Sequence, residues 1–267
     1  MTAPLFQVDA FTDRPFGGNP AAVCLLPAWK EDRWLQAVAR EMNLSETAFL
    51  VKQPDHFDLR WFTPTVEVDL CGHATLASAH FLWQQGRAPG EEIRFSTRSG
   101  VLKAVRQGDE IELDFPLKPE EPAQAPPGLL EALGTSARYV GKNQFDYLVE
   151  VESEAALRGI APDFRRLATV PVRGIIVTSA SADPRFDFVS RFFAPASGVD
   201  EDPVTGSAHC CLADFWRKRL GKAAFVAFQA SARGGVVKVR VTKDRAFLGG
   251  KAITVATGEL LVEGNEP

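Results

Sequence analysis

Two stretches of the chain repeat one succession of residue types, and this repeat limits the possible folds more than any other feature. Arg60–Pro64 reads RWFTP and Arg191–Pro195 reads RFFAP, so the two match in type at every position. Each is followed by a short loop and then by a Gly-x-Ala triplet, at Gly72 and at Gly206, that opens a mostly apolar segment of helical length. The shared order predicts an internal duplication of one strand–loop–helix unit. The alternative is a chance similarity between two such units.

A proline-rich segment separates the two stretches. Residues 116–128, PLKPEEPAQAPPG, contain five prolines and almost no large apolar side chain, which is typical of an extended linker. We therefore predict one domain over residues 1–117 and a second over residues 118–253, with the tail at 254–267 returning to the first domain. Both halves mix short strands with helices, and a further helix is indicated near residues 31–44 by the spacing of Trp34, Val38 and Met42.

Composition excludes several classes of protein. The chain has 267 residues, of which 45% are hydrophobic and 24% charged, so a packed core is expected. The net charge is -4 and no basic run is present, which argues against nucleic-acid binding. No apolar stretch is long enough to cross a bilayer, and the first residues do not resemble a signal peptide. We expect a cytoplasmic protein with no membrane or nucleic-acid partner.

The cysteines and histidines do not have the spacing of a disulfide framework or a metal site. The four cysteines include an adjacent pair, Cys210 and Cys211, and are expected to be free thiols in a reducing compartment. Neither C-x-x-C nor H-E-x-x-H occurs, so no metal site is predicted.

The two glycine-led helix entrances are candidate anion sites. A helix start leaves backbone N–H groups without partners and carries partial positive charge, and glycine lets a ligand approach closely. Gly72-His73 and Gly206-Ser207 are therefore candidates for holding a carboxylate, and a duplicated fold would bring both into one cleft between the domains. A phosphate is less favoured because no phosphate-binding glycine motif is present. The alternative is that each glycine only allows the chain to turn into a helix.

Four acidic residues are considered together with these entrances. Asp202 precedes a proline that stiffens the loop before Gly206, which favours a positioned carboxylate, whereas Asp200 and Glu201 fit ordinary helix-capping groups. Glu46 stands at the front of an apolar strand, where its raised proton affinity would suit a general acid/base. The alternative for Glu46 is an ordinary polar residue at a loop-to-strand junction.

With these residues identified, the chain resembles the PhzF-like family of phenazine-biosynthesis isomerases, which shares its fold with diaminopimelate epimerase. The matching stretches are VDAFTDRPFGGNPAAVCL, NLSETAFL, FTP-x-x-E-V-D-L-C-G-H-A-T-L-A and DEDPVTGSAH, and they span both halves. The resemblance implies an α+β fold of two pseudo-symmetric domains. Each would be a curled, barrel-like, mixed or antiparallel sheet around a central apolar helix, with the helices starting at Gly72 and Gly206.

The resemblance also implies roles for individual residues. Glu46 matches the proton-shuttling glutamate, and His73 and Asp202 match polar partners facing it across the cleft. The backbone cradle for a substrate carboxylate matches Gly72, Gly206 and Ser207. No metal or organic cofactor is implied, the partner is a small carboxylate substrate, and a homodimer is expected.

The favoured function is a cofactor-independent isomerase that moves a proton by general acid/base catalysis. One alternative is an amino-acid epimerase or racemase on the same fold. Diaminopimelate epimerase uses a cysteine on each side of its cleft, and here Cys71 precedes the first helix whereas DEDPVTGS contains none. Another alternative is a non-catalytic carboxylate-binding protein. A cysteine hydrolase using Cys71 and His73 is disfavoured, because residues two apart at such a turn are expected to point away from one another and no acid is placed to orient His73.

Overall fold

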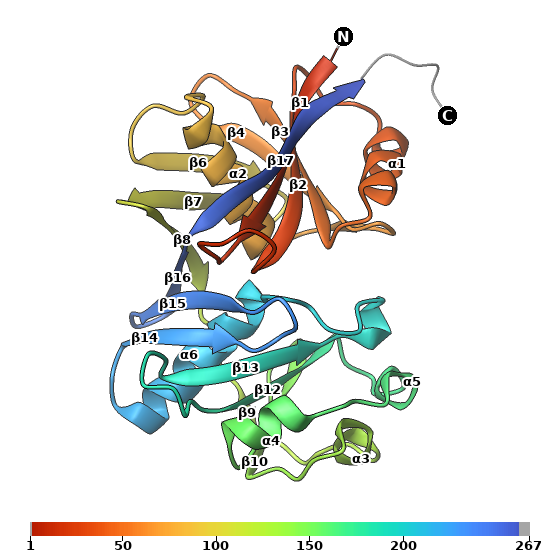
Figure 1. Ribbon diagram of the computed structural model, residues 1–267, viewed down its shortest axis with the longest axis vertical. Coiled ribbons are helices and arrows are strands. Elements are labelled where there is room, and N and C mark those ends of the chain that lie inside the picture. The colour runs from red at the N-terminus through yellow and green to blue at the C-terminus, as the bar shows by residue number, and fades with distance from the viewer. Residues whose placement is uncertain (1, 262–267) are drawn as a thin grey trace. The chain divides into compact units, whose positions relative to one another are not determined.

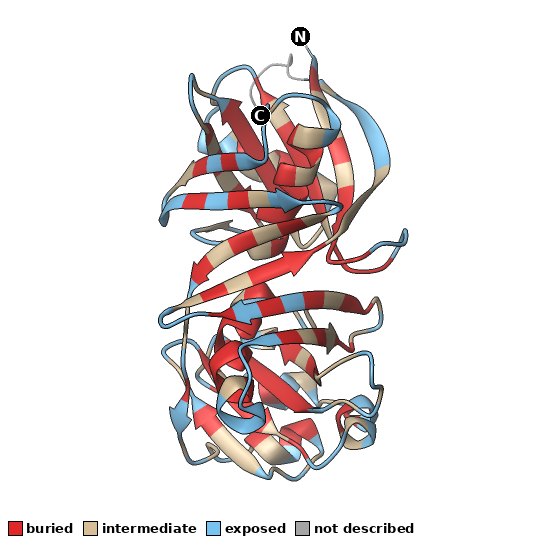
Figure 2. Ribbon diagram, turned by 90° about the vertical axis from the view of Figure 1, so that its left-hand side faces the viewer, coloured by how far each residue is buried: buried red, intermediate tan, exposed pale blue. Residues whose placement is uncertain are grey.

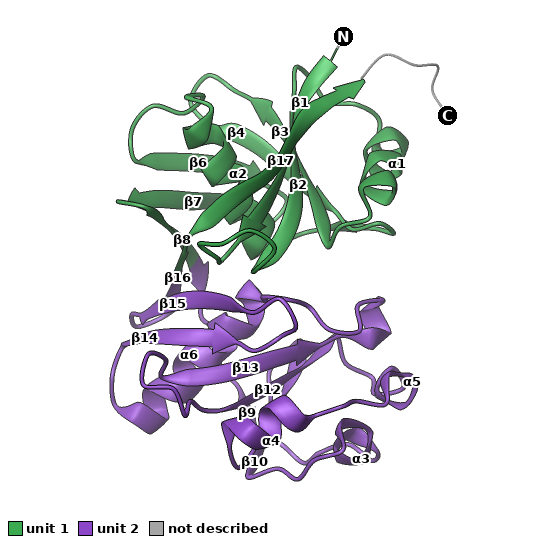
Figure 3. Ribbon diagram, viewed as in Figure 1, with its two compact units in different colours: residues 1–114, 249–267 green, residues 115–248 purple. Residues whose placement is uncertain are grey.

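The computed structural model describes residues 2–261 and divides into two compact units of mixed helix and strand (Figure 3). Unit 1 comprises residues 1–114 and 249–267, and unit 2 comprises residues 115–248. The α+β class predicted from the sequence is confirmed.

Most elements of unit 1, including the C-terminal strand β17, are labelled in Figure 1. They are β1 (Thr2–Ala10), β2 (Asn19–Leu26), α1 (Asp32–Met42), β3 (Glu46–Lys52), β4 (Phe57–Phe62), β5 (Glu67–Val68), α2 (Gly72–Gln84), β6 (Glu92–Thr97), β7 (Gly100–Gln107), β8 (Glu110–Pro116) and β17 (Ala252–Leu261).

The elements of unit 2 follow β8 along the chain. They are β9 (Glu121–Pro122), α3 (Leu129–Leu133), β10 (Tyr139–Lys142), β11 (Asp146–Glu150), α4 (Glu154–Gly159), α5 (Phe164–Leu167), β12 (Gly174–Ala180), β13 (Phe188–Phe193), a 3-10 turn (Pro195–Ser197), α6 (Gly206–Leu220), β14 (Ala224–Gln229), β15 (Gly235–Val241) and β16 (Arg245–Gly250).

The two units repeat one scheme of strand pairing. In unit 1, β1 pairs antiparallel with β17 and β2, β2 runs parallel to β3, β3 is antiparallel to β4, and β4 is parallel to β6, which is followed by antiparallel β7. In unit 2, β10 pairs antiparallel with β9 and β11, and the same succession continues through β12, β13, β14 and β15. The same order of parallel and antiparallel pairs in both units supports the predicted duplication and pseudo-symmetry.

The repeated sequence motif has a repeated structural role. Arg60 of β4 forms a two-bond ion pair with Glu67, in which its Nε and Nη2 atoms each lie 2.7 Å from a carboxylate oxygen. Arg191 of β13 forms the same pair with Glu201, at 2.7 and 2.9 Å. Each guanidinium also lies near the phenylalanine two residues later, Phe62 or Phe193. The prediction that Glu201 caps the following helix is wrong, because its carboxylate is engaged by Arg191.

Helix α2 is enclosed by the sheet of unit 1. It contacts β1, β2, β3, β7 and β17, and its residues from His73 to Leu82 are buried except His80. The hydroxyls of Thr75 and Ser78 lie in this interior because each donates a hydrogen bond to the carbonyl four residues earlier. An all-round apolar sequence is typical of such a buried helix. No helix in residues 2–261 is long and apolar enough to cross a membrane.

Helix α6 is the counterpart of α2 in unit 2. Its residues from Gly206 to Trp216 are buried apart from Ser207, and only its last turn reaches solvent. Along strands such as β8 and β15, buried residues alternate with intermediate or exposed ones, as the colours of Figure 2 show. Helix α1 instead packs one face against β3 and β4, as the spacing of Trp34, Val38 and Met42 predicted.

A pair of identical substitutions in α6 tests how far stability depends on the enclosed helix. Leu212 is fully buried and Leu220 is 42% exposed. We expect Leu212→Ala to lower the free energy of unfolding by about 2–5 kcal/mol, because it removes buried methyl groups and leaves a cavity. Leu220→Ala should cost about 1 kcal/mol or less. Urea unfolding followed by tryptophan fluorescence measures both, and equal effects would contradict the enclosed position of Leu212.

Candidate functional site

Unit 1 gathers four polar side chains at the start of α2. Glu46 is the first residue of β3, and its Oε2 atom lies 3.1 Å from Nε2 of His73, the second residue of α2. The other ring nitrogen, Nδ1, lies 3.1 Å from the amide nitrogen of Asn19 and 3.5 Å from Sγ of Cys71. The side chain of Glu46 is 18% exposed and that of His73 is 6% exposed. The group is therefore buried, with Glu46 as its most accessible member.

Strand register brings these residues together. Parallel β2 and β3 begin at the same end of the sheet, where Ala21 is the partner of Glu46 and Asn19 opens β2. The turn before Asn19 is held by buried Asp9, whose carboxylate accepts the backbone N–H of Phe16 at 2.8 Å. Gly18 has φ +58°, and a Cβ there would lie 2.0 Å from the carbonyl oxygen of Ala10. Only glycine fits this turn, which places Asn19 against His73.

The charges of the group are coupled. Burial alone opposes a charge on the His73 ring, but its neighbours, among them the Glu46 carboxylate, outweigh this effect and raise the pKa of His73 well above its ordinary value. Burial raises the pKa of Cys71 to about 11, and the nearby Glu46 carboxylate acts in the same direction. Cys71 is therefore a neutral thiol near neutral pH, which does not favour an activated nucleophile.

One expectation about this turn is wrong. Cys71 and His73 were expected to point apart, with no acid to orient His73, whereas the Cys71 sulfur contacts one nitrogen of the ring and Glu46 contacts the other. Cys71 is the residue before the first helical turn and has extended backbone angles, φ -143° and ψ 112°, which turn its side chain back toward the ring. The geometric argument against a cysteine hydrolase therefore fails, and the buried neutral thiol is the remaining argument against it.

Unit 2 places Asp202 in a hydrogen-bonded loop before α6. The Asp202 carboxylate accepts the hydroxyl of Thr205, the residue before the first turn of α6. Gln229 of β14 ties this loop to the sheet. Its side-chain amide donates to the carbonyl of Asp202 at 2.7 Å and its side-chain oxygen accepts the N–H of Thr205 at 2.8 Å. The loop is thus fixed from two sides, and Asp202 is a positioned carboxylate.

Ser207, the second residue of α6, lies beside Arg173, which was not among the residues predicted from the sequence. Nη2 of Arg173 donates to the Ser207 hydroxyl at 3.1 Å and also binds the carboxylate of Asp146, which is 1% exposed. Burial raises the pKa of Asp146, while Arg173 acts to lower it. Because the Ser207 oxygen accepts from Arg173, its own hydrogen can be donated elsewhere. A buried acid thus orients a guanidinium that is 39% exposed beside the helix start.

Both helix starts lack a capping side chain. The residues before α2 and α6, Cys71 and Thr205, make no side-chain hydrogen bond to the helix, whereas Ser153 caps α4 and Asp163 caps α5. The first-turn N–H groups at Gly72 and Gly206 are therefore not satisfied by a side-chain cap within residues 2–261. Such groups can bind an anion.

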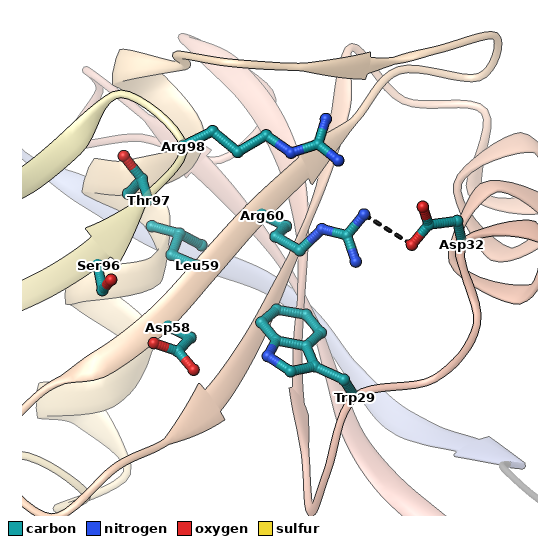
Figure 4. Close-up of a pocket in the computed structure, with 8 residues that line it drawn as sticks. All are labelled: Trp29, Asp32, Asp58, Leu59, Arg60, Ser96, Thr97 and Arg98. Atoms are coloured by element: carbon teal, nitrogen blue, oxygen red, sulfur yellow. Dashed lines mark hydrogen bonds and ion pairs between the residues drawn. The ribbon is translucent and has the colours of Figure 1, made fainter.

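A surface hollow of about 400 Å³ lies elsewhere in unit 1. Figure 4 shows the Arg60 guanidinium between Trp29 and Arg98 and bound to Asp32. Glu67 also pairs with both arginines, so their charge is neutralised by protein carboxylates. The lining includes none of the predicted site residues, and we do not assign the hollow a catalytic role.

Several residues of the two groups were missed by sequence reasoning. Asn19 was interpreted only as turn chemistry, although an asparagine that opens an apolar strand could have been singled out. Arg173 and Gln229 gave no signal, because each is a single polar residue beside a strand and its partners come from distant segments.

Comparisons with known proteins agree on one family. A family model described as phenazine biosynthesis-like protein matches residues 8–258. An uncharacterized isomerase from Halalkalibacterium halodurans is 54% identical over 264 residues, which cover 98% of this chain and 100% of that protein. A crystal structure of a PhzF-family phenazine biosynthesis protein from Enterococcus faecalis has a TM-score of 0.94 and 40% identity, covering 98% of this chain and 100% of that one. A probable proline racemase from Agrobacterium radiobacter, with a TM-score of 0.67, 12% identity and coverage of 99% and 94%, shares the fold alone.

His209 is buried in the first turn of α6, and we therefore expect the free energy of unfolding to depend on pH. Its Nδ1 atom donates to the carbonyl of Thr205 at 2.8 Å, and burial lowers its pKa from 6.5 to about 4. Between these values the unfolded chain binds more protons, so acidification should lower the free energy of unfolding by up to about 3 kcal/mol. Urea unfolding at about pH 7.5 and about pH 4.5 should show this loss in the parent and a smaller one in His209→Gln. An equal loss in both would show that His209 is not the cause.

Proposed function

Because the chain belongs to the PhzC-PhzF family of phenazine biosynthesis-like proteins, we propose that it is a cofactor-independent isomerase that moves a proton on a small carboxylate-bearing substrate. The observation that carries this proposal is the contact between Glu46 and His73 in the buried group of unit 1. The isomerase names of close relatives support it at the level of the family.

Glu46 is the proposed proton carrier. Its carboxylate takes a proton from a substrate carbon, the electron pair moves into the adjacent conjugated system, and the same carboxyl group returns the proton to another carbon. His73 contacts Oε2 at 3.1 Å, so it fixes one carboxylate oxygen and leaves the other for the substrate. Glu46 is also the most accessible member of its group, which suits a residue that must reach a ligand.

The helix starts are the proposed holders of the substrate carboxylate. The N–H groups at Gly72 and Gly206 are not capped by side chains, and their dipoles favour an anion. Ser207 can donate its hydroxyl hydrogen, and Arg173 adds a positive charge oriented by Asp146. Asp202 is held by Thr205 and Gln229, so it can accept a hydrogen bond from a polar group of the substrate. That the two groups serve one substrate remains a prediction.

The alternatives make different demands on these residues. A racemase with two thiols would need a second cysteine, but the residue before the first turn of α6 is Thr205, where α2 has Cys71. An epimerase that uses Glu46 would invert a stereocentre, whereas allylic isomerisation would move a double bond. A non-catalytic binding protein could keep the helix starts and would not need Glu46.

The role of Glu46 is tested by removing its titration while keeping its shape. We expect Glu46→Gln to slow deuterium incorporation from heavy water into small carboxylates by at least about a hundredfold, because general acid/base catalysis is lost. Carboxylate binding, measured by calorimetry, should be nearly intact. The control is Glu41→Gln, at an exposed position of α1, which should behave as the parent. Mass spectrometry measures exchange, and exchange in Glu46→Gln as fast as in the parent would exclude Glu46 and direct attention to Asp202.

The role of Ser207 is tested by deleting its hydroxyl. Ser207→Ala keeps the ion pair of Arg173 with Asp146, so we expect an unchanged melting temperature. Affinity for the carboxylate should fall about three- to tenfold, as for one lost hydrogen bond. Ser136→Ala, at an exposed position of unit 2, is the control. Calorimetric titration with the same carboxylate measures both, and unchanged affinity in Ser207→Ala would remove Ser207 from the binding site.

A further inference from the structure

The polar group of unit 1 contains the donor atoms of a metal site. Glu46, Cys71 and His73 each offer one ligand atom, and these atoms all lie within 4.8 Å of one another. One is a thiol sulfur, one an imidazole nitrogen and one a carboxylate oxygen. Cys71 and His73 are 6% and 5% exposed, so two of the three are more than nine-tenths buried. The three residues come from the start of β3 and the entrance of α2, which explains why no sequence spacing indicated them.

We propose that Glu46, Cys71 and His73 form a binding site for Zn²⁺ or a similar thiophilic divalent ion, and that occupation of this site blocks proton transfer by Glu46. Sulfur, imidazole nitrogen and carboxylate oxygen are all ordinary zinc ligands, and thiolate selects zinc over magnesium or calcium. Three protein ligands leave a fourth position for water.

The observed spacing is close to what zinc requires. Ligand atoms of a tetrahedral zinc site lie about 3.5 Å apart, given metal–ligand bonds of about 2.0–2.3 Å. The Cys71 sulfur lies 3.5 Å from Nδ1 of His73, and Oε2 of Glu46 lies 3.1 Å from Nε2. These two contacts are to different ring nitrogens, whereas the metal would bind only one of them, so the third ligand must move closer to complete the tetrahedron. Glu46 can do this, because its side chain is the most accessible of the three.

Binding would follow a simple proton balance. The Cys71 thiol and the protonated His73 ring each release one proton to solvent as they form a bond to the metal, and the Glu46 carboxylate supplies the third bond. No oxidant or reductant takes part. The ion would replace the contact between Glu46 and His73, and the carboxylate could no longer accept a proton from a carbon.

Cobalt provides a direct test that needs no substrate. Co²⁺ follows zinc coordination and absorbs light through sulfur-to-cobalt charge transfer when a thiolate is bound. We expect the parent protein to bind one Co²⁺ with this band, and Zn²⁺ to displace it. Cys71→Ser should lose the band and bind at least about tenfold more weakly, since even outer groups of a metal site are worth that much. Cys71→Ala should lose the band as well, which would assign the loss to the missing sulfur and not to the introduced serine. Circular dichroism checks that this variant is folded.

The matched control is another buried free cysteine. Cys210 lies in α6 of unit 2, away from Glu46 and His73 in the sequence, and Cys210→Ser should keep the band and the affinity of the parent. No charge-transfer band in the parent, or a band lost in Cys210→Ser and kept in Cys71→Ser, would overturn the proposed site.

Inhibition is tested separately from binding. Zn²⁺ should slow deuterium exchange by the parent relative to the rate of the parent in the presence of a chelator. Inhibition of Cys71→Ser, measured against the rate of Cys71→Ser in chelator, should need at least about a tenfold higher Zn²⁺ concentration. Zinc that binds through Cys71 without slowing exchange would overturn the proposed block while leaving the site. A parent that exchanges no carboxylate but shows the cobalt band would contradict the proposed isomerase function and not the metal site, so the two failures are distinguishable.

Discussion

The enclosure of one apolar helix by each curled sheet is the constraint on which the rest of the structure depends. The first N–H groups of a helix have no partner within it, and they therefore need partners from the rest of the protein, from water or from a ligand. In α4 and α5, which lie at the surface, Ser153 and Asp163 provide them. In α2 and α6 no side chain does so within the described chain. The two helices that organise the cores therefore begin with N–H groups that no side chain caps.

This constraint also explains where the polar side chains gather. A sheet that curls around a helix brings the starts of parallel strands near the helix entrance, as β2 and β3 do with Asn19 and Glu46. Because the surroundings are apolar, the charge on one of these polar groups depends on its neighbours. Burial opposes a charge on His73, and neighbours that include the Glu46 carboxylate outweigh it and raise its pKa.

The sequence predicted the architecture well and the contacts poorly, for a physical reason. Local patterns in a sequence indicate where helices lie and whether a unit is repeated. Such patterns are present here in the apolar segments after Gly72 and Gly206 and in the matching motifs at Arg60 and Arg191. Whether the Cys71 sulfur faces His73 depends on a single pair of backbone angles before α2. Whether Arg173 reaches Ser207 depends on how β12 and α6 pack, across 34 positions of the chain. Such contacts arise from register and packing, which spacing in one sequence does not encode.

The two units share one arrangement of strands and helix but differ in the side chains at the helix entrance. The arginine–glutamate pair is present in both, at Arg60 and at Arg191, and it fixes the loop that leads to each central helix. The residues at the helix entrance differ: Cys71 and His73 in one unit stand where Thr205 and Ser207 stand in the other. The first pair offers a thiol and an imidazole, whereas the second offers hydroxyl groups beside a guanidinium. A duplicated frame therefore allows the two entrances to carry different side chains, because each can vary at these positions without loss of the enclosed helix.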